Sequence, residues 1–268
     1  MPKTIVITGA SGGIGTALAE RLGTEGHSLA LAARRHDLLE RVADQAMQRG
    51  SPRAIAVQAD VTRRGDVEHL RDATLGAFGG FDVWINNAGR GITRNVLDLT
   101  DDDVDLMMAV NVKSALYGMQ IAVQHFIARG GHGHVINVSS FLGRVPLATY
   151  RSAYNAAKAA LNALTANLRM DLRAKYPDIH VTLVMPGIVG TYFGRNALYS
   201  PPDTPIYSGP NVQSVEDAVG IISDVITHPV AEVYTNPASG SLAQRYFADV
   251  GAFEEQGVRW GTEPARPQ

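Results

Sequence analysis

A tyrosine and a lysine four residues apart, Tyr154 and Lys158, are the strongest candidates for proton transfer in this chain. At that spacing two side chains of a helix share one face. A free tyrosine has a pKa of about 10, and a cation beside it favours the phenolate and lowers that pKa. Lys158 can supply the cation, so Tyr154 is a candidate general acid and base. Taken alone, the same spacing is more typical of a solvated helix face, so the interpretation depends on the rest of the chain.

A glycine-rich turn near the N-terminus is the second chemical feature. The β-branched run 3–8 leads directly into four glycines within 9–15, and apolar residues at helical spacing follow. Gly9 permits the turn, Gly13 lets a pyrophosphate approach the backbone, and Gly15 lets the helix pack against the sheet. The start of that helix offers free N–H groups and a positive dipole end to phosphate. The predicted cofactor contacts in this segment are Gly9, Ser11, Gly13, Ile14 and Gly15.

The end of the second predicted strand indicates which dinucleotide binds. Residues 28–33 lead into Arg34 and Arg35, where an NAD site usually carries an acid for the adenine ribose. Asp37 comes later and is typical of a helix cap. Two arginines suit a dianionic 2′-phosphate, which predicts NADP(H), with NAD(H) the less favoured alternative. Arg34 is the expected main contact and Ser11 a helper, whereas a solvated arginine pair is the structural alternative.

Strand-like and helix-like segments alternate along the chain, which predicts right-handed crossovers and a parallel sheet covered on both faces. The expected class is therefore α/β, a doubly wound, Rossmann-type sheet in a single domain over residues 1–250. The predicted strands are 3–8, 28–33, 54–59, 82–86, 134–139, 180–185 and 231–235. The predicted helices are 13–25, 37–49, 64–78, 101–129, 152–176 and 214–227.

Two segments are not expected to form regular elements. Residues 190–212 follow a strand's carboxyl end, where ligands bind in open α/β sheets, and such long loops are often lids. A disordered insertion is the alternative. Residues 251–268 are polar and contain proline, and are expected to form a loose tail.

Composition limits the other function classes. The chain has 268 residues, 45% of them hydrophobic, a net charge of −2 and no cysteine. The charge argues against nucleic-acid binding, and the lack of cysteine excludes disulfides, thiolate metal sites and cysteine nucleophiles. No further cluster of metal ligands is apparent around His132 and His134. The N-terminus runs directly into a core strand and no apolar run approaches membrane-spanning length, so a soluble cytoplasmic protein is expected.

Five motifs occur in an order that resembles the short-chain dehydrogenase/reductase family, in its shorter, single-domain branch. They are Thr8 to Gly15, Asn86-Asn87-Ala88-Gly89, Ser139-Ser140, Tyr154-Asn155-Ala156-Ala157-Lys158 and Pro186-Gly187. The resemblance implies that Lys158 also holds the nicotinamide ribose, that Ser140 binds the substrate oxygen and that Asn111 holds a water linking Lys158 to solvent. Ser140 precedes Tyr154 by fourteen positions, one more than the usual family spacing, so Ser139 is the fallback.

The resemblance also implies further cofactor contacts and an assembly. The first contact is the adenine edge at Asp60 and Val61. The second is the wall after the fourth strand, and the third is the loop over the nicotinamide. A homodimer or homotetramer through the long helices is expected. The residues of the wall and the loop are Asn87, Ala88, Gly89, Pro186, Gly187, Ile188 and Thr191.

Together the motifs predict an NADP(H)-dependent oxidoreductase that interconverts an alcohol and a ketone or aldehyde by hydride transfer. A catalytically silent NADP-binding regulatory or scaffold protein is the alternative, although such proteins commonly lose the tyrosine or lysine that this chain keeps. A methyltransferase on a similar sheet would explain neither Tyr154 nor Arg34. An apolar substrate is expected, in a pocket lined by Phe141, Leu142, Val145, Leu147, Tyr192 and Phe193.

Overall fold

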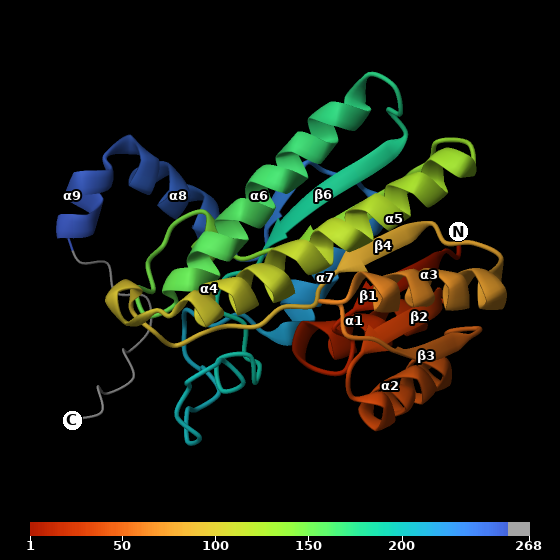
Figure 1. The fold of residues 1–268 in the computed structure, drawn as a ribbon, viewed down its shortest axis with the longest axis horizontal. Coiled ribbons are helices and arrows are strands. Elements are labelled where there is room, and N and C mark those ends of the chain that lie inside the picture. The colour runs from red at the N-terminus through yellow and green to blue at the C-terminus, as the bar shows by residue number, and fades with distance from the viewer. Residues whose placement is uncertain (257–268) are drawn as a thin grey trace.

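A computed structural model describes residues 1–256 and shows one sheet of seven parallel strands (Figure 1). The strand order is β3-β2-β1-β4-β5-β6-β7, so the chain changes direction across the sheet between β1 and β4. At such a switch point the carboxyl ends of the strands leave a crevice for a ligand. The strands are β1 (Thr4–Thr8), β2 (Ser28–Ala33), β3 (Ala54–Gln58), β4 (Val83–Asn86), β5 (Gly133–Val138), β6 (Ile179–Met185) and β7 (Glu232–Tyr234).

Helices cover both faces of the sheet, as the alternating pattern predicts. One face carries α1 (Gly13–Thr24), α2 (His36–Arg49) and α7 (Val215–Thr227). The face nearer the viewer in Figure 1 carries α3 (Arg64–Phe78), α4 (Asp101–Met108), α5 (Ser114–Ala128) and α6 (Ser152–Arg173). The Rossmann-type α/β fold is therefore confirmed.

Alternation along β1 shows how the strands divide two cores. Ile5 and Ile7 face α1, α2 and α7, whereas Val6 packs on the other side with Trp84 and Phe126. All five side chains are fully buried. Successive strand residues point to opposite faces, so a run that is apolar throughout fits a strand covered on both sides.

The predicted helix 101–129 forms as three consecutive pieces. Thr100 caps it in a reciprocal capping box with Asp103, and a π-helical turn, η2 (Ala109–Lys113), separates α4 from α5. Asp101–Ala128 is long and apolar enough to cross a membrane by length and composition, contrary to expectation, but 56% of its apolar window is buried. Core helices of soluble proteins meet the same criterion, so this helix is weak evidence for a membrane span.

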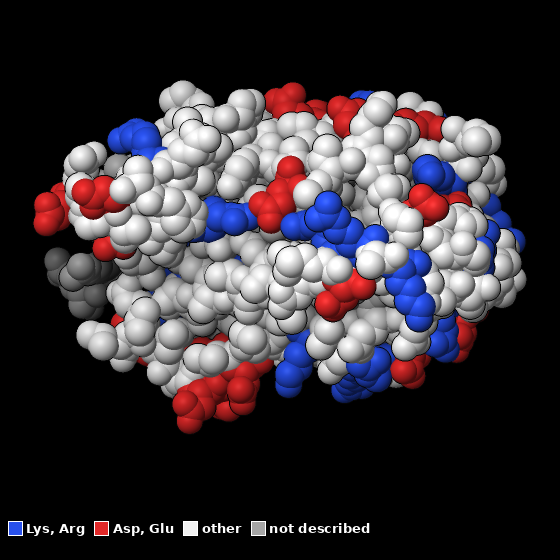
Figure 2. Space-filling model, turned by 90° about the horizontal axis from the view of Figure 1, so that it is seen from above, with Lys and Arg blue, Asp and Glu red and all other residues white. Residues whose placement is uncertain are grey.

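The C-terminal part contains more structure than predicted. Beyond β7 the chain forms α8 (Ala238–Ala248) and α9 (Val250–Glu255), so the start of the expected tail is helical, and Phe253 is buried. The rest of that tail, 257–268, lies outside the described residues. Two short 3-10 turns, η1 (Val96–Asp98) and η3 (Phe141–Gly143), complete the elements. Acidic and basic side chains are interspersed over the face in Figure 2.

Candidate active site

The predicted motifs meet at the carboxyl ends of β1, β4, β5 and β6. The segment Asn86-Asn87-Ala88-Gly89 hydrogen-bonds the carboxyl end of β4 to that of β1. Asn87 donates from Nδ2 to the carbonyl oxygen of Thr8 at 2.9 Å, and the Thr8 hydroxyl accepts from the N–H groups of Asn87 and Ala88, both at 3.1 Å. Across β5 and β6, the N–H of Phe141 donates to the Pro186 carbonyl at 2.8 Å. These bonds explain how motifs far apart in sequence form one site.

Tyr154 lies in the first turn of α6, with only 6% of its surface exposed. Burial raises the pKa of Tyr154 to about 12, against the lowering effects of a hydrogen bond with Ser140 and the charge of Arg151. The Phe193 ring packs beside the Tyr154 ring, with centroids 5.5 Å apart. A phenol in this setting is a proton donor, and it needs further positive charge before it can serve as a base near neutrality.

Lys158 is equally buried but does not bond to the phenol. Its Nζ donates to the carbonyl oxygen of Val138 at 2.9 Å and lies 5.8 Å from the centre of the Tyr154 ring. Burial lowers the pKa of Lys158 to about 7. The expectation that Lys158 lowers the tyrosine pKa is therefore not met in this state, because burial outweighs the nearby charges at Tyr154 and weakens the lysine's own charge.

The two serines after β5 have different surroundings. Ser139 donates to the carboxamide oxygen Oδ1 of Asn162 at 2.5 Å and to the carbonyl oxygen of Lys158 at 3.3 Å, so it anchors α6. Ser140 caps η3, accepting from the N–H of Leu142 at 3.1 Å, and is the serine bonded to Tyr154. The geometry thus favours Ser140 for binding a substrate oxygen, despite the extra residue in the spacing.

Asn111 sits in the π-helical turn and fixes the chain after β4. Its Nδ2 donates to the carbonyl oxygens of Arg90 and Met107 at 3.0 and 3.1 Å, and its Oδ1 accepts from the N–H of Arg90 at 3.1 Å. A Cβ added at Gly89 would lie 3.0 Å from Asn111 Oδ1 and 3.5 Å from Lys158 Nζ. The lack of a side chain at Gly89 therefore leaves room for both Asn111 and Lys158 beside it, while the water-holding role stays a prediction.

The glycine turn has the shape that a pyrophosphate requires. Gly9 and Gly13 have φ of +68° and +55°, and a Cβ at Gly9 would meet the Cα of Ala88 at 2.7 Å. The N-cap of α1 is Gly12, which supplies no side-chain cap, and the first turn holds no acid. The first N–H groups of α1 are thus available to an anion. Thr191 lies opposite, 3.6 Å from the Cβ position of Gly13.

The two arginines after β2 point to different places. Arg35 Nη2 donates to the carbonyl and hydroxyl oxygens of Ser11 at 2.9 and 3.2 Å. The charge of Arg34 instead acts on Asp60, where burial would raise the carboxyl pKa but hydrogen bonds from Thr62 and the arginine charge lower it. The arginine lying over the glycine turn is therefore Arg35, whereas Arg34 was the expected main contact.

The other predicted cofactor contacts differ in how far they are buried and in what they contact. Asp60 closes its own turn by accepting from the N–H and hydroxyl of Thr62 at 3.0 and 2.7 Å. Val61 is buried in the core, and Ile14 packs partly against the opposite core. In the loop after β6, the Ile188 carbonyl accepts from the N–H of Gln213 at 2.8 Å, and Gly187 lies against Asn236.

Part of the predicted substrate pocket is wrong. Phe141 and Val145 are buried with Ala243 and Phe253 beneath α8 and α9, so they do not face the Tyr154 side. Leu142 does pack with Tyr154, and Phe193 covers that tyrosine. Leu147 packs partly into the first group, and Tyr192 is 55% exposed. The sequence signal that was missed is the apolar pattern of residues 238–253, because apolar side chains in these residues need other apolar side chains to pack against.

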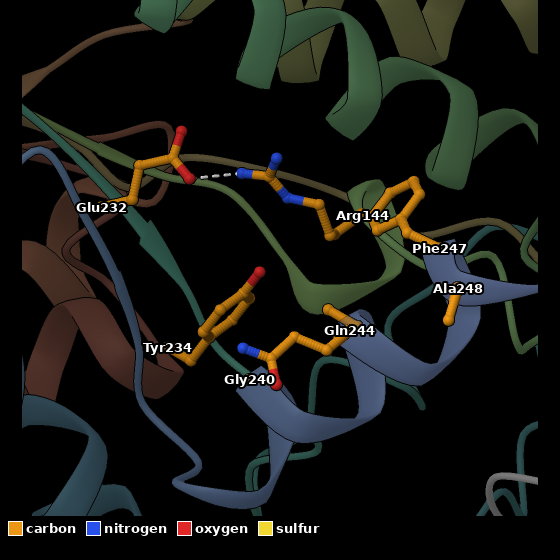
Figure 3. Close-up of a pocket in the computed structure, with 8 residues that line it drawn as sticks. Arg144, Glu232, Tyr234, Gly240, Gln244, Phe247 and Ala248 are labelled. Atoms are coloured by element: carbon orange, nitrogen blue, oxygen red, sulfur yellow. Dashed lines mark hydrogen bonds and ion pairs between the residues drawn. The ribbon is translucent and has the colours of Figure 1, made fainter.

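A pocket of about 550 Å³ lies on another part of the surface, between β7, η3 and α8 (Figure 3). Arg144 and Glu232 point toward one another there and form an ion pair of 2.5 Å. Tyr234 and Gln244 lie below this pair in the same view. None of the predicted catalytic residues lines this pocket.

Sequence reasoning also missed Arg151. Arg151 is only 5% exposed and is the N-cap residue of α6, one turn before Tyr154. A basic residue between two tyrosines at the start of a helix was the available signal.

Comparisons with known proteins identify the family and the fold. A profile of the short chain dehydrogenase family matches residues 3–199. A Bacillus subtilis protein named as an uncharacterised oxidoreductase is 32% identical over 241 residues, covering 90% of this chain and 67% of its own. A short-chain dehydrogenase/reductase from Burkholderia phymatum in complex with NAD is similar, with a TM-score of 0.84 and 26% identity. The match covers 99% of this chain and 98% of that one. An alcohol dehydrogenase from Thermococcus sibiricus complexed with 5-hydroxy-NADP has a TM-score of 0.75 and 28% identity, covering 87% and 96%.

Proposed function

Because this chain is an oxidoreductase of the short-chain dehydrogenase/reductase family, we propose that it interconverts an alcohol and a ketone or aldehyde using NADP(H). The observation that carries the proposal is the buried phenol of Tyr154, bonded with Ser140 at the strand ends that also hold the glycine turn. A site that joins a phosphate cradle to a proton donor has the parts that carbonyl reduction requires.

In the proposed reduction, the substrate oxygen lies between the Tyr154 and Ser140 hydroxyls. When bound, reduced nicotinamide would supply the hydride, with its electron pair, that the carbonyl carbon receives. Ser140 donates a hydrogen bond to the oxygen as negative charge develops there, and Tyr154 transfers its phenolic proton to that oxygen. In the reverse direction the Tyr154 phenolate takes the alcohol proton. A phenol whose pKa is about 12 without ligand favours the donor role.

Lys158 has two proposed tasks. Its Nζ would bind the nicotinamide ribose, exchanging its present acceptor, the Val138 carbonyl, for the ribose hydroxyls. When protonated it would also lower the pKa of Tyr154 and so support the alcohol-to-carbonyl direction. Because the pKa of Lys158 is about 7, its charge is sensitive to whatever anion lies near it.

The preference for NADP(H) rests on the end of β2. Arg34 and Arg35 follow Ala33, and no acid stands there to bind the ribose hydroxyls. Arg35 lies over Ser11 in the glycine turn, which supports the proposal that its guanidinium binds a 2′-phosphate by charged hydrogen bonds. Related structures bind NAD or an NADP derivative, so the preference is a proposal about these two arginines.

A panel of ketones and aldehydes tests the proposal, with NADPH and then NADH followed by absorbance of the reduced cofactor. We expect turnover of at least one carbonyl compound, faster with NADPH. Cofactor binding without turnover across the panel would instead support the silent, NADP-binding alternative.

We also propose a homodimer or homotetramer through the long helices. Met170 on α6 is 65% exposed and Ile127 on α5 is 36% exposed. Analytical ultracentrifugation tests this; a monomer at micromolar concentration would contradict it.

A further inference from the structure

A buried guanidinium joins three segments around the phenol of Tyr154. Arg151 Nη1 donates to the carbonyl oxygen of Ile92 at 3.1 Å and to the hydroxyl of Thr93 at 3.0 Å. Its Nη2 reaches the hydroxyl of Tyr207 at 3.5 Å. The loop after β4, the first turn of α6 and the segment 190–212 therefore meet at one side chain.

The same place is closed by backbone contacts. Residues 90–95 form two isolated backbone β-bridges. Ile92 pairs with Leu198 in the segment 190–212, and Arg94 pairs with Arg151. A Cβ added at Gly91 would lie 3.2 Å from the Phe193 ring and 3.3 Å from Arg151 Nη1. Phe193 in turn packs against Tyr154. The segment 190–212 thus covers the phenol, and Arg151 lies beneath that cover.

Arg151 carries a charge that no acid neutralises. Across residues 1–256, the ion pairs with Asp or Glu within 4.0 Å include none made by this arginine. Its partners are a carbonyl, a hydroxyl and the phenols of Tyr207 and Tyr150, and its guanidinium lies 5.2 Å from the centre of the Tyr150 ring. Burying a cation without an acidic partner costs several kcal/mol of desolvation, which its hydrogen bonds to neutral acceptors only partly offset.

We propose that Arg151 is a positioning residue that clasps the segment 190–212 over Tyr154 and keeps a permanent positive charge beside the phenol when that segment is closed. Arginine stays protonated at all working pH values, unlike the buried Lys158. Closing the segment excludes water, so the same charge acts more strongly on Tyr154 than when the segment is open. The Tyr207 contact, at 3.5 Å, joins Arg151 to the segment 190–212, so it is the one that opening would break.

The first test concerns closure and does not depend on the proposed function. Arg195 is exposed and is the one Lys or Arg in 190–212, so trypsin reports on this segment by cutting after it. We expect Arg151→Met and Tyr207→Phe to be cut at Arg195 several-fold faster than the unmodified protein. Arg173→Met is the matched control, because Arg173 is an exposed arginine in the last turn of the same helix. Equal cleavage in all four proteins would overturn the clasp.

The second test concerns charge and rests on the proposed function. We expect Arg151→Met to move the pH profile of alcohol oxidation to higher pH and to lower kcat about tenfold on its rising limb, because one pKa unit changes the ionised fraction tenfold. Arg151→Lys keeps the charge and should retain the profile while losing part of the clasp. This variant, with Tyr207→Phe, also decides the matter if Arg151→Met fails to fold. An unshifted profile in Arg151→Met would overturn the charge role. If the unmodified protein turns over no carbonyl compound, the proposed function fails. The trypsin comparison still decides whether Arg151 holds the segment 190–212 closed.

Discussion

Lys158 bonds to the carbonyl oxygen of Val138 at 2.9 Å, while Tyr154, one helical turn away, bonds with Ser140. The two central residues of the site are thus held by different strand-end groups. Attraction between a Tyr154 phenolate and a Lys158 ammonium could offset the cost of burying these charges only if both groups were ionised. Burial raises the pKa of Tyr154 and lowers the pKa of Lys158, so it favours the neutral form of each. This arrangement makes the site sensitive to pH and to bound anions.

Lys158 should make the stability of the unliganded protein depend on pH. Its pKa falls from 10.5 to about 7 on folding, so the unfolded state binds more protons between these values. Stability is therefore full above about pH 10.5, decreases as pH falls toward 7 and levels off below it. The difference is on the order of 5 kcal/mol. Chemical unfolding at several pH values should show this slope in the unmodified protein and lose it in Lys158→Met; parallel curves would contradict the neutral lysine.

The two serines should respond differently to removal of their hydroxyls. Ser140→Ala removes the group bonded with Tyr154, so we expect kcat/KM to fall by about 10²-fold with little change in stability. Ser139→Ala breaks bonds to α6 and should cost about 1–3 kcal/mol of unfolding free energy. Steady-state kinetics and denaturant unfolding of both variants separate the roles. A larger kinetic loss in Ser139→Ala would reverse the assignment.

Arg35 should contribute more than Arg34 to NADPH binding. A hydrogen bond to a charged group contributes about 1.5–3 kcal/mol, so Arg35→Met should weaken NADPH binding about 10- to 100-fold and leave NADH binding nearly unchanged. Fluorescence titration with both cofactors measures this for Arg35→Met and Arg34→Met. Arg41→Met, an exposed residue of α2, is the control. Tighter binding of NADH than NADPH by the unmodified protein would contradict the cofactor proposal.

Gly15 should not tolerate a methyl group. A Cβ there would meet the carbonyl oxygen of Gly9 and lie 3.0 Å from the Cα of Ala10. We expect Gly15→Ala to lower the unfolding free energy by about 1–3 kcal/mol through this overlap. Gly220→Ala on α7 is the control, since a Cβ there meets nothing within 4 Å and alanine should stabilise that helix by about 0.5–1 kcal/mol. Equal stability changes in the two variants would contradict the close packing of α1.

The sheet and most elements could be predicted because their signals are local. Apolar runs such as 135–138 and 181–185 identify buried strands, and the glycines mark the turn before α1. The one sequence signal for the π-helical turn was Asn111 itself, a poor helix former in the middle of a predicted helix. It depends on hydrogen bonds to Arg90, more than twenty residues away.

Side-chain directions in the site could not be predicted from spacing. Arg34 and Arg35 are adjacent and chemically alike, yet Arg35 bonds to Ser11 while the charge of Arg34 acts on Asp60. The burial of Phe141 follows from its packing with Ala243 of α8 and Phe253 of α9, and the apolar pattern of 238–253 does not by itself say which residues it covers. Such features arise from tertiary contacts.

The central claim is that Tyr154 transfers the proton to and from the substrate oxygen. Steady-state kinetics of Tyr154→Phe, with NADPH binding measured in parallel, test it most directly. We predict a loss of kcat of about 10²- to 10⁴-fold, the usual contribution of general acid catalysis, with the NADPH dissociation constant changed less than threefold or so. Unchanged turnover in Tyr154→Phe would show that another group handles the proton and would contradict the proposed mechanism.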